Sequence, residues 1–181
     1  MKRIITVASL SAATLCTAAA SADPIFPDGT YIRAFGGVTS GLSGGDMGSG
    51  PTSGLALGRS FDGPRYELEL SRRSSDLDLG GERDVDAVMI NVYRDLDGLT
   101  ESRRLTPYVG AGLGALRLSA AGDSETGAAV QVMSGLRYDI GGSAALSGEL
   151  RYTASDARVT GPTGQIDADG LGVVVGLELD F

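Results

Sequence analysis

Apolar and polar residues alternate along most of this chain. The clearest stretch runs from Leu171 to Phe181, where every odd position is apolar and the even positions are Gly, Val, Gly, Glu and Asp. A period of two residues predicts a β-strand with one apolar face. At about 3.3 Å per residue and a tilt near 45°, such a strand crosses a layer roughly 25 Å thick.

The same pattern predicts seven earlier strands, and no segment after residue 22 has the apolar spacing of an amphipathic helix. Short turns are expected at 62–64 and 140–142, and longer connections rich in Gly, Ser and Asp lie between other strands. The near alternation of short and long connections places the short ones at one end of the predicted structure and the long ones at the other, as in a barrel with short periplasmic turns and long outer loops. The connection 95–106 is the exception, because it is long where a short turn is expected. The predicted strands are 30–39, 53–61, 65–72, 85–94, 107–118, 128–139 and 143–153, and the longer connections are 40–52, 73–84, 119–127 and 154–170.

The two faces of these strands differ in chemistry. One carries Leu, Val, Ile and Tyr, and the other carries glycines together with charged residues. An eight-stranded barrel has an interior just wide enough for side chains, so charged residues can pair there while the apolar face meets lipid. We therefore predict an all-β fold, an eight-stranded antiparallel up-and-down transmembrane β-barrel. The residues predicted to form an ion network in its lumen are Glu67, Glu69, Arg137, Glu149, Arg151 and Glu178.

The glycine content fits such a barrel. All 28 glycines lie after residue 22, where they make up about 18% of the residues, against roughly 7% in ordinary proteins. Glycines in alternating segments indicate strands that curve tightly.

The first residues have the features of a secretory signal peptide. Two basic residues precede the apolar run 4–15, and small residues stand before a cleavage site expected between Ala22 and Asp23. The run is too short for a transmembrane helix. We expect a signal peptide over 1–22 and one barrel domain over 23–181.

Composition then narrows the function. Cys16 is the only cysteine, and it lies in the signal, without the usual lipid-attachment pattern before it, so disulfide bonds are excluded from the mature chain. Removing Lys2 and Arg3 changes the formal net charge from −8 to −10, which argues against nucleic acid as a partner. The absence of histidine excludes His-dependent catalysis, and the lack of mature cysteine excludes thiol catalysis and the usual zinc sites. We expect no enzyme activity, no metal site and no cofactor.

The end of the last predicted strand resembles a known sorting signal. Gly176, Leu179 and the terminal Phe181 are similar to the C-terminal signature by which the insertion machinery of bacterial outer membranes recognises its substrates. The resemblance implies that this machinery is a partner of the chain.

Two further motifs resemble a family. Residues 91–95 (NVYRD) and 107–114 (PYVGAGLG) look like the porin-family outer-membrane β-barrel domain, of the OmpX/Opa-like and OmpA-barrel group. The resemblance covers essentially all of 23–181, and the long linker 95–106 is a familiar feature of that family. It implies a monomeric integral protein of the Gram-negative outer membrane, in contact with lipid and lipopolysaccharide.

The favoured function is a structural or surface-interaction (adhesin-like) role without catalysis, with an unidentified host or extracellular ligand. A narrow diffusion channel is the first alternative. A soluble periplasmic, lipocalin-like ligand-binding barrel is the second, because periodicity alone does not say which face of a barrel points inward.

Overall fold

The computed structural model describes residues 27–42, 49–76, 82–100, 102, 104–120, 122–161 and 164–181. The expected signal peptide and the cleavage site at Ala22 and Asp23 lie outside these residues. None of the described residues forms a helix long and apolar enough to cross a membrane. The strands are β1 (Thr30–Gly41), β2 (Ser49–Ser60), β3 (Pro64–Asp76), β4 (Glu82–Asp95), β5 (Leu105–Ala120), β6 (Asp123–Gly141), β7 (Ala144–Ser155), β8 (Arg158–Gly161), β9 (Gly164–Asp167) and β10 (Gly170–Asp180).

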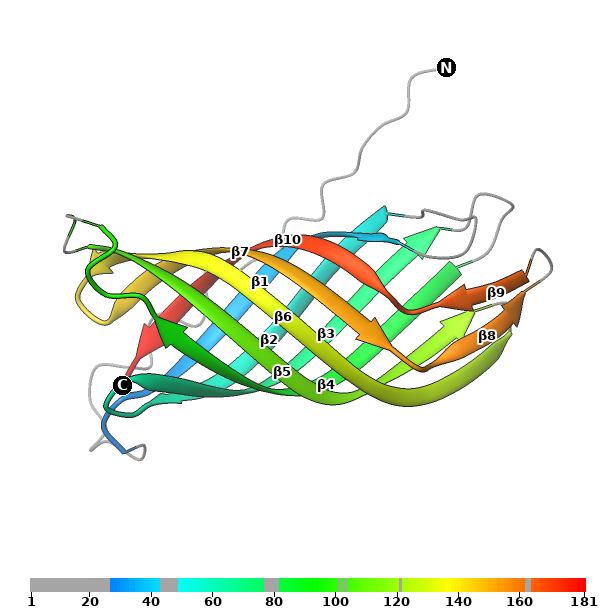
Figure 1. Ribbon diagram of the computed structural model, residues 1–181, viewed down its shortest axis with the longest axis horizontal. Coiled ribbons are helices and arrows are strands. Elements are labelled where there is room, and N and C mark those ends of the chain that lie inside the picture. The colour runs from blue at the N-terminus through cyan, green and yellow to red at the C-terminus, as the bar shows by residue number, and fades with distance from the viewer. Residues whose placement is uncertain are drawn as a thin grey trace, which may run out of the picture.

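Eight of these strands form one closed antiparallel barrel (Figure 1). Each strand from β1 to β7 pairs with the next, β7 pairs with β10, and β10 pairs with β1 to complete the ring. The predicted fold class is therefore confirmed. Closure leaves no barrel strand with an unpaired edge, which is the condition for placing a sheet in hydrocarbon.

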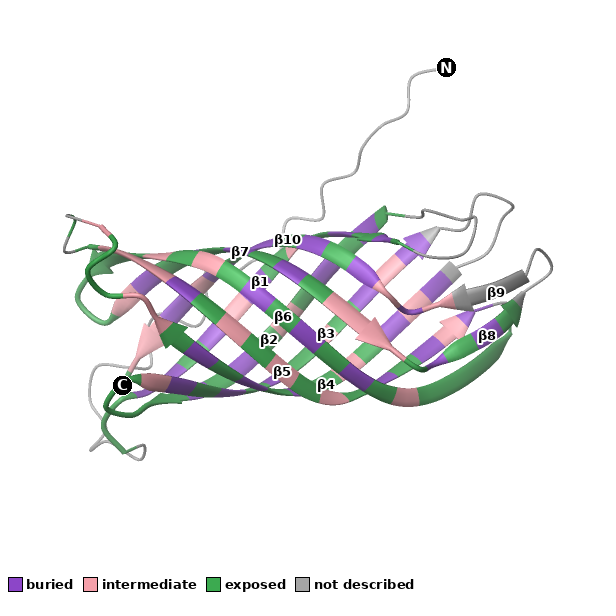
Figure 2. Ribbon diagram, in the orientation of Figure 1, coloured by how far each residue is buried: buried purple, intermediate pink, exposed green. Residues whose placement is uncertain are grey.

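Inward and outward residues alternate along each strand, as the burial colours in Figure 2 show. On β10, Val174 is 1% exposed, whereas its neighbour Val175 is 60% exposed. On β4 and β5 the outward Ile90 and Leu113 are 58% and 65% exposed and lie directly opposite each other. Large apolar side chains thus form a continuous belt on the outer wall.

Inward-facing glycines make room for aromatic rings. Of the six tyrosines, Tyr31, Tyr93 and Tyr108 point into the barrel, although we expected tyrosine on the outer face. Each of them, and Phe35 as well, lies directly opposite a glycine on the next strand, so its ring covers the place where a side chain would stand. These cross-strand pairs are Tyr31–Gly58, Phe35–Gly54, Tyr93–Gly110 and Tyr108–Gly135.

Gly110→Ala should therefore destabilise the barrel. A Cβ at Gly110 would lie 2.5 Å from Cδ1 of Tyr93, so the buried ring would have to move, at a cost of about 1–3 kcal/mol. Gly148→Ala is the matched control, because a Cβ there meets nothing within 4 Å. Urea unfolding of both variants in detergent micelles measures the difference, and equal midpoints would contradict this packing role.

Several predicted connections are wrong, because the strands run further than their apolar residues do. Segment 119–127 lies mostly in β5 and β6, which pair up to Ala120 and Asp123. Segment 73–84 is shortened by β3 and β4, and 154–170 contains the separate ribbon β8–β9. The backbone ladder continues through Ser, Thr and Asp residues that alternation of apolar residues does not mark.

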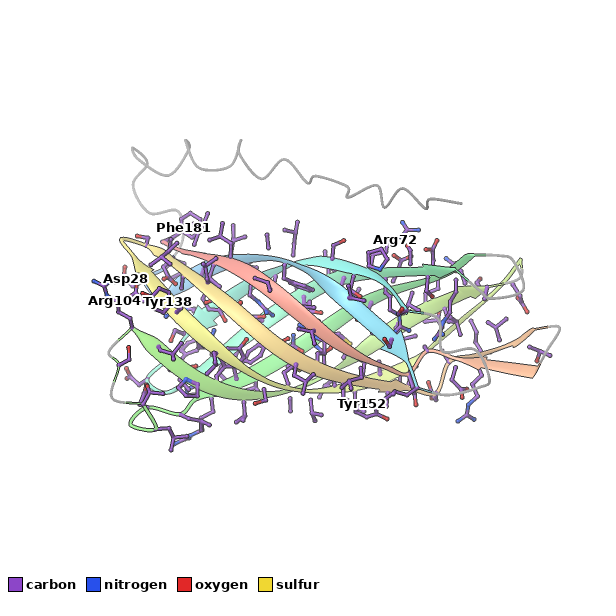
Figure 3. The ribbon with its side chains drawn as sticks, turned by 90° about the horizontal axis from the view of Figure 1, so that it is seen from above. Asp28, Arg72, Arg104, Tyr138, Tyr152 and Phe181 are labelled. Carbon is purple, nitrogen blue, oxygen red and sulfur yellow. The ribbon has the colours of Figure 1, made fainter. Side chains whose placement is uncertain are left out.

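The barrel has two distinct ends. The end that carries Asp28 and Phe181 is here called the terminal end, and Arg104 and Tyr138 lie there too (Figure 3). The opposite end, here called the far end, carries the ribbon β8–β9 (Figure 1). Tyr152 marks the outer wall nearer the far end.

Candidate functional site

The lumen is filled by an ion-paired cluster centred on Arg33. This side chain projects inward from β1, and the residue is 1% exposed. Its Nη2 lies 2.7 Å from Oε2 of Glu67 and 3.7 Å from Oε2 of Glu69, and its Nη1 lies 3.6 Å from Oε2 of Glu149. Arg33 thus links three strands, β1, β3 and β7, across the barrel.

Arg151 contacts two of the carboxylates that Arg33 also approaches, those of Glu69 and Glu149. Its Nη1 lies 2.6 Å from Oε1 of Glu69, and its Nη2 lies 2.7 Å from Oε1 of Glu149. Each of these glutamates therefore lies between two guanidinium groups. Their charges are compensated in a space from which water is largely excluded, which is the condition for keeping charges buried.

Two further arginines continue the cluster toward the terminal end. Nη2 of Arg65 lies 3.0 Å from Oδ1 of Asp95, and its Nη1 lies 3.7 Å from Oε2 of Glu178. Arg137 approaches Glu178 through Nε at 2.8 Å and Asp180 through Nη2 at 3.1 Å. The pairs form a ladder from mid-barrel to the rim.

Inward tyrosines complete the polar contacts. The hydroxyl of Tyr31 donates to Glu67 at 2.8 Å, and that of Tyr108 donates to Glu149 at 3.1 Å. The guanidinium carbon of Arg65 lies 5.2 to 5.8 Å from the ring centres of Tyr31, Tyr93 and Tyr108. Cation–π contact stabilises the arginine in addition to its ion pairs.

The structure thus brings all six predicted lumen residues inside, with Arg137 at the rim. The prediction from sequence did not include Arg33 and Arg65, because no faces were assigned to the strand 30–39 and Arg65 was not counted as inward. For Arg65 the signal was present, since it has the same parity in its strand as Glu67. For Arg33 the signal was weak, since the residues of the same parity beside it, Tyr31 and Phe35, are aromatic.

The far half of the lumen is filled differently. Inward Val85, Leu116 and Leu118 pack there, and Val159 of β8 packs against them. Arg73 of β3 holds the segment after β9 against the barrel, because its Nη2 donates a hydrogen bond to the backbone oxygen of Ala168 at 2.8 Å. Apolar side chains and the attached ribbon close this end of the barrel.

The residues of the C-terminal signature lie on β10 and just after it. Gly176 faces the lumen opposite Phe35, whereas Leu179 is half-buried and pairs with Ile32. Phe181 is 42% exposed, and its backbone N–H donates to the oxygen of Thr30 at 2.9 Å.

The structure is a closed barrel with an apolar belt outside and a charged interior, and comparison with known families gives the same architecture. The sequence profile of the outer membrane protein β-barrel domain matches residues 6–178. The chain belongs to this family. It is therefore an integral protein of the outer membrane, and its belt faces lipid. Membership removes the soluble, lipocalin-like alternative.

Solved structures agree in fold. This outer-membrane barrel is similar to Neisserial surface protein A, with a TM-score of 0.71 and 18% identity over 85% of this chain and 98% of that one. It is also similar to OprG of Pseudomonas aeruginosa, with a TM-score of 0.57 and 17% identity over 85% and 96%. The N-terminal barrel of OprF from the same organism gives a TM-score of 0.52 and 17% identity over 85% and 98%. No curated protein matches this chain by sequence.

Arg137→Ala should destabilise this outer-membrane barrel by about 1–3 kcal/mol, the range for losing hydrogen bonds to charged partners. Its side chain is 24% exposed, so water partly solvates the carboxylates that it leaves behind. Arg158→Ala is the control, because the ion pair of Arg158 is exposed and such pairs contribute little. Urea midpoints in micelles compare the two, and an Arg137 variant no weaker than the Arg158 variant would contradict the rim contact.

Proposed function

We propose that this protein is a non-conducting, non-catalytic barrel that acts as a monomer and serves a structural or surface-interaction, adhesin-like role. The observation that carries the proposal is the position of Arg33, held in mid-lumen between carboxylates from two other strands. A side chain fixed by several charged contacts resists displacement by water and ions.

A second obstruction supports the proposal. The apolar cluster around Leu116 and Leu118 occupies the far half of the lumen, where Val159 of the ribbon packs against it. A solute would have to displace both fillings in series. The narrow diffusion channel, our first alternative, is therefore disfavoured.

The same contacts argue against catalysis. Glu67, Glu69 and Glu149 each face a guanidinium group, so no lumen carboxylate among them is free to exchange protons with a substrate. Among the described residues, no cluster of three or more His, Cys, Asp or Glu could hold a metal ion. Function then falls to the outer surface.

We assign the far end to the cell exterior. Barrels of this class have short periplasmic turns, and their longer segments lie outside. The strands that run past the apolar belt and the ribbon β8–β9 are at the far end. An extracellular ligand would meet these segments.

Liposome swelling tests the closed lumen. Vesicles that contain the folded protein should swell in an isotonic pentose solution no faster than empty vesicles. Sustained swelling would favour the diffusion channel. A parallel assay compares binding of matrix proteins to cells with and without the barrel, and equal binding would argue against the adhesin-like role.

The C-terminal signature makes a separate prediction. Deleting Phe181 removes an exposed ring and one backbone hydrogen bond, so folding into detergent should persist. In cells, assembled protein should fall and periplasmic degradation should rise, because the insertion machinery would lose its recognition residue. Heat-modifiable gel shifts measure folding in detergent and the amount of assembled protein in cells. Normal assembly in cells would remove Phe181 from that role.

A further inference from the structure

The outer wall changes character sharply near the far end. Along β5 the outward residues are apolar up to Ala115, but the next outward residue is Arg117, and the inward Leu116 and Leu118 are buried. The two faces have therefore exchanged chemistry, as they would where a strand leaves lipid and enters water. One row of directly paired outward residues marks this boundary on five strands: Ser53, Arg72, Asp86, Arg117 and Thr126.

An apolar groove lies directly below this row. Its volume is about 550 Å³, and it is bordered by Leu55, Leu70 and Val88, with the small Ala115 leaving space beside them. Arg72, Asp86 and Arg117 stand at its upper rim. A second groove on the outer wall, about 470 Å³ near Ala34 and Val175, has no charged residue in its lining.

A polar hollow lies directly above the same boundary. Its volume is about 360 Å³, and its polar lining consists of Asp84, Asp123, Ser119, Ser124 and Arg117. Arg117 lines both hollows, so one guanidinium group stands between an apolar groove and a hydroxyl- and carboxylate-lined cup.

Of the two arginines at the boundary, Arg72 is ion-paired, whereas Arg117 is available to bind an anionic ligand. Arg72 is engaged, with Nη2 at 2.9 Å from Asp84 and Nε at 3.6 Å from Asp86. Hydrogen bonds from Ser74 and Arg72 hold the pKa of Asp84 below its usual range, so this carboxylate stays ionised. Arg117 donates to the hydroxyl of Ser124 at 3.0 Å and makes no ion pair with any described residue.

We propose that this double hollow binds a phosphorylated glycolipid of the outer leaflet, lipopolysaccharide. One acyl chain lies in the groove beside Ala115, a sugar phosphate pairs with Arg117, and sugar hydroxyls donate to Asp84. The proposal rests on the assignment of the far end to the exterior, because lipopolysaccharide occupies only the outer leaflet.

The surroundings favour a glycolipid over a simple anionic phospholipid. Arginine recognises phosphate through paired N–H donors, which suits Arg117. The carboxylates of Asp84 and Asp123 repel the phosphate of either lipid, but they accept hydrogen bonds from the several hydroxyls of a sugar headgroup. The groove continues the lipid-facing belt, so an acyl chain already in the membrane enters it without leaving hydrocarbon.

Binding of purified lipopolysaccharide to the delipidated, folded barrel in detergent tests the proposal, read by native mass spectrometry. Arg117→Ala and Ala115→Leu should each weaken binding by about tenfold or more, the first by removing the phosphate partner and the second by filling the groove. Arg59→Ala and Ala111→Leu are the matched controls, since Arg59 is an outward arginine near the terminal end and Ala111 lies outward on β5 away from the groove. Both controls should bind as the wild type does.

A second arm uses phosphatidylglycerol and should show weak binding that neither Arg117→Ala nor Ala115→Leu changes. Equal losses for the two lipids would overturn the glycolipid assignment. Loss of lipopolysaccharide binding in Arg59→Ala alone would reverse the orientation, and wild-type binding by all four variants would remove the site. Liposome swelling depends on the lumen and not on this outer-wall site. A failure of the glycolipid proposal can therefore be told apart from a failure of the closed-lumen proposal.

Discussion

Arg33→Met should destabilise the folded barrel by about 3–5 kcal/mol, the range for removing one partner of a buried charge cluster. The substitution keeps a long side chain but leaves Glu67, Glu69 and Glu149 with less positive charge in a space closed to water. Urea titration in micelles, read by heat-modifiable gel shift, measures the free energy of unfolding.

Two further variants test whether this loss of stability comes from the buried charge cluster. Arg104→Met removes an exposed arginine in the turn before β5 and should change the unfolding free energy little. Adding Glu67→Gln to Arg33→Met should restore part of the loss, because one uncompensated carboxylate disappears. Equal midpoints for the Arg33 and Arg104 variants would show that the cluster does not hold the barrel together.

Leu113→Arg should cost about 2–4 kcal/mol, the range for a basic residue on the lipid face near the bilayer midplane. Leu113 is 65% exposed on the outer wall, between Ile90 and Val130 in the row that crosses the middle of the belt. In water such an exposed position would tolerate arginine, so the cost arises from lipid.

Leu99→Arg is the matched control, because Leu99 is 70% exposed in the turn after β4, outside the belt. Reversible unfolding from lipid vesicles should separate the two variants. If Leu113→Arg unfolded at the same urea concentration as Leu99→Arg, this part of the outer wall would not lie in hydrocarbon.

The fold was predictable wherever alternation and lipid act on the same residues. On β10 the parity of Val174 and Val175 already separates the buried residue from the exposed one, because one face must meet hydrocarbon. The prediction failed where the strand leaves lipid. Beyond Leu118 the β5–β6 ladder continues through Ser119, Ser124 and Glu125, and these polar residues were predicted to form a connection.

The sequence predicted that a charged network fills the lumen, but it did not predict that Arg33 lies at the centre of this network. Glu67 and Glu69 lie in a clear alternating run, which gave their direction. Arg33 lies among Tyr31, Phe35 and several glycines, where both faces contain apolar or small residues. Which residues meet across the lumen depends on how far each strand is shifted against its neighbours, and alternation within one strand does not contain that shift.

Single-channel recording in planar bilayers tests the closed lumen most directly. Wild-type protein, shown by gel shift to be folded and inserted, should give no current steps above the baseline, because the Arg33 cluster and the apolar filling around Leu116 block the path in series. Steady unitary currents that scale with the amount of inserted protein would contradict the account.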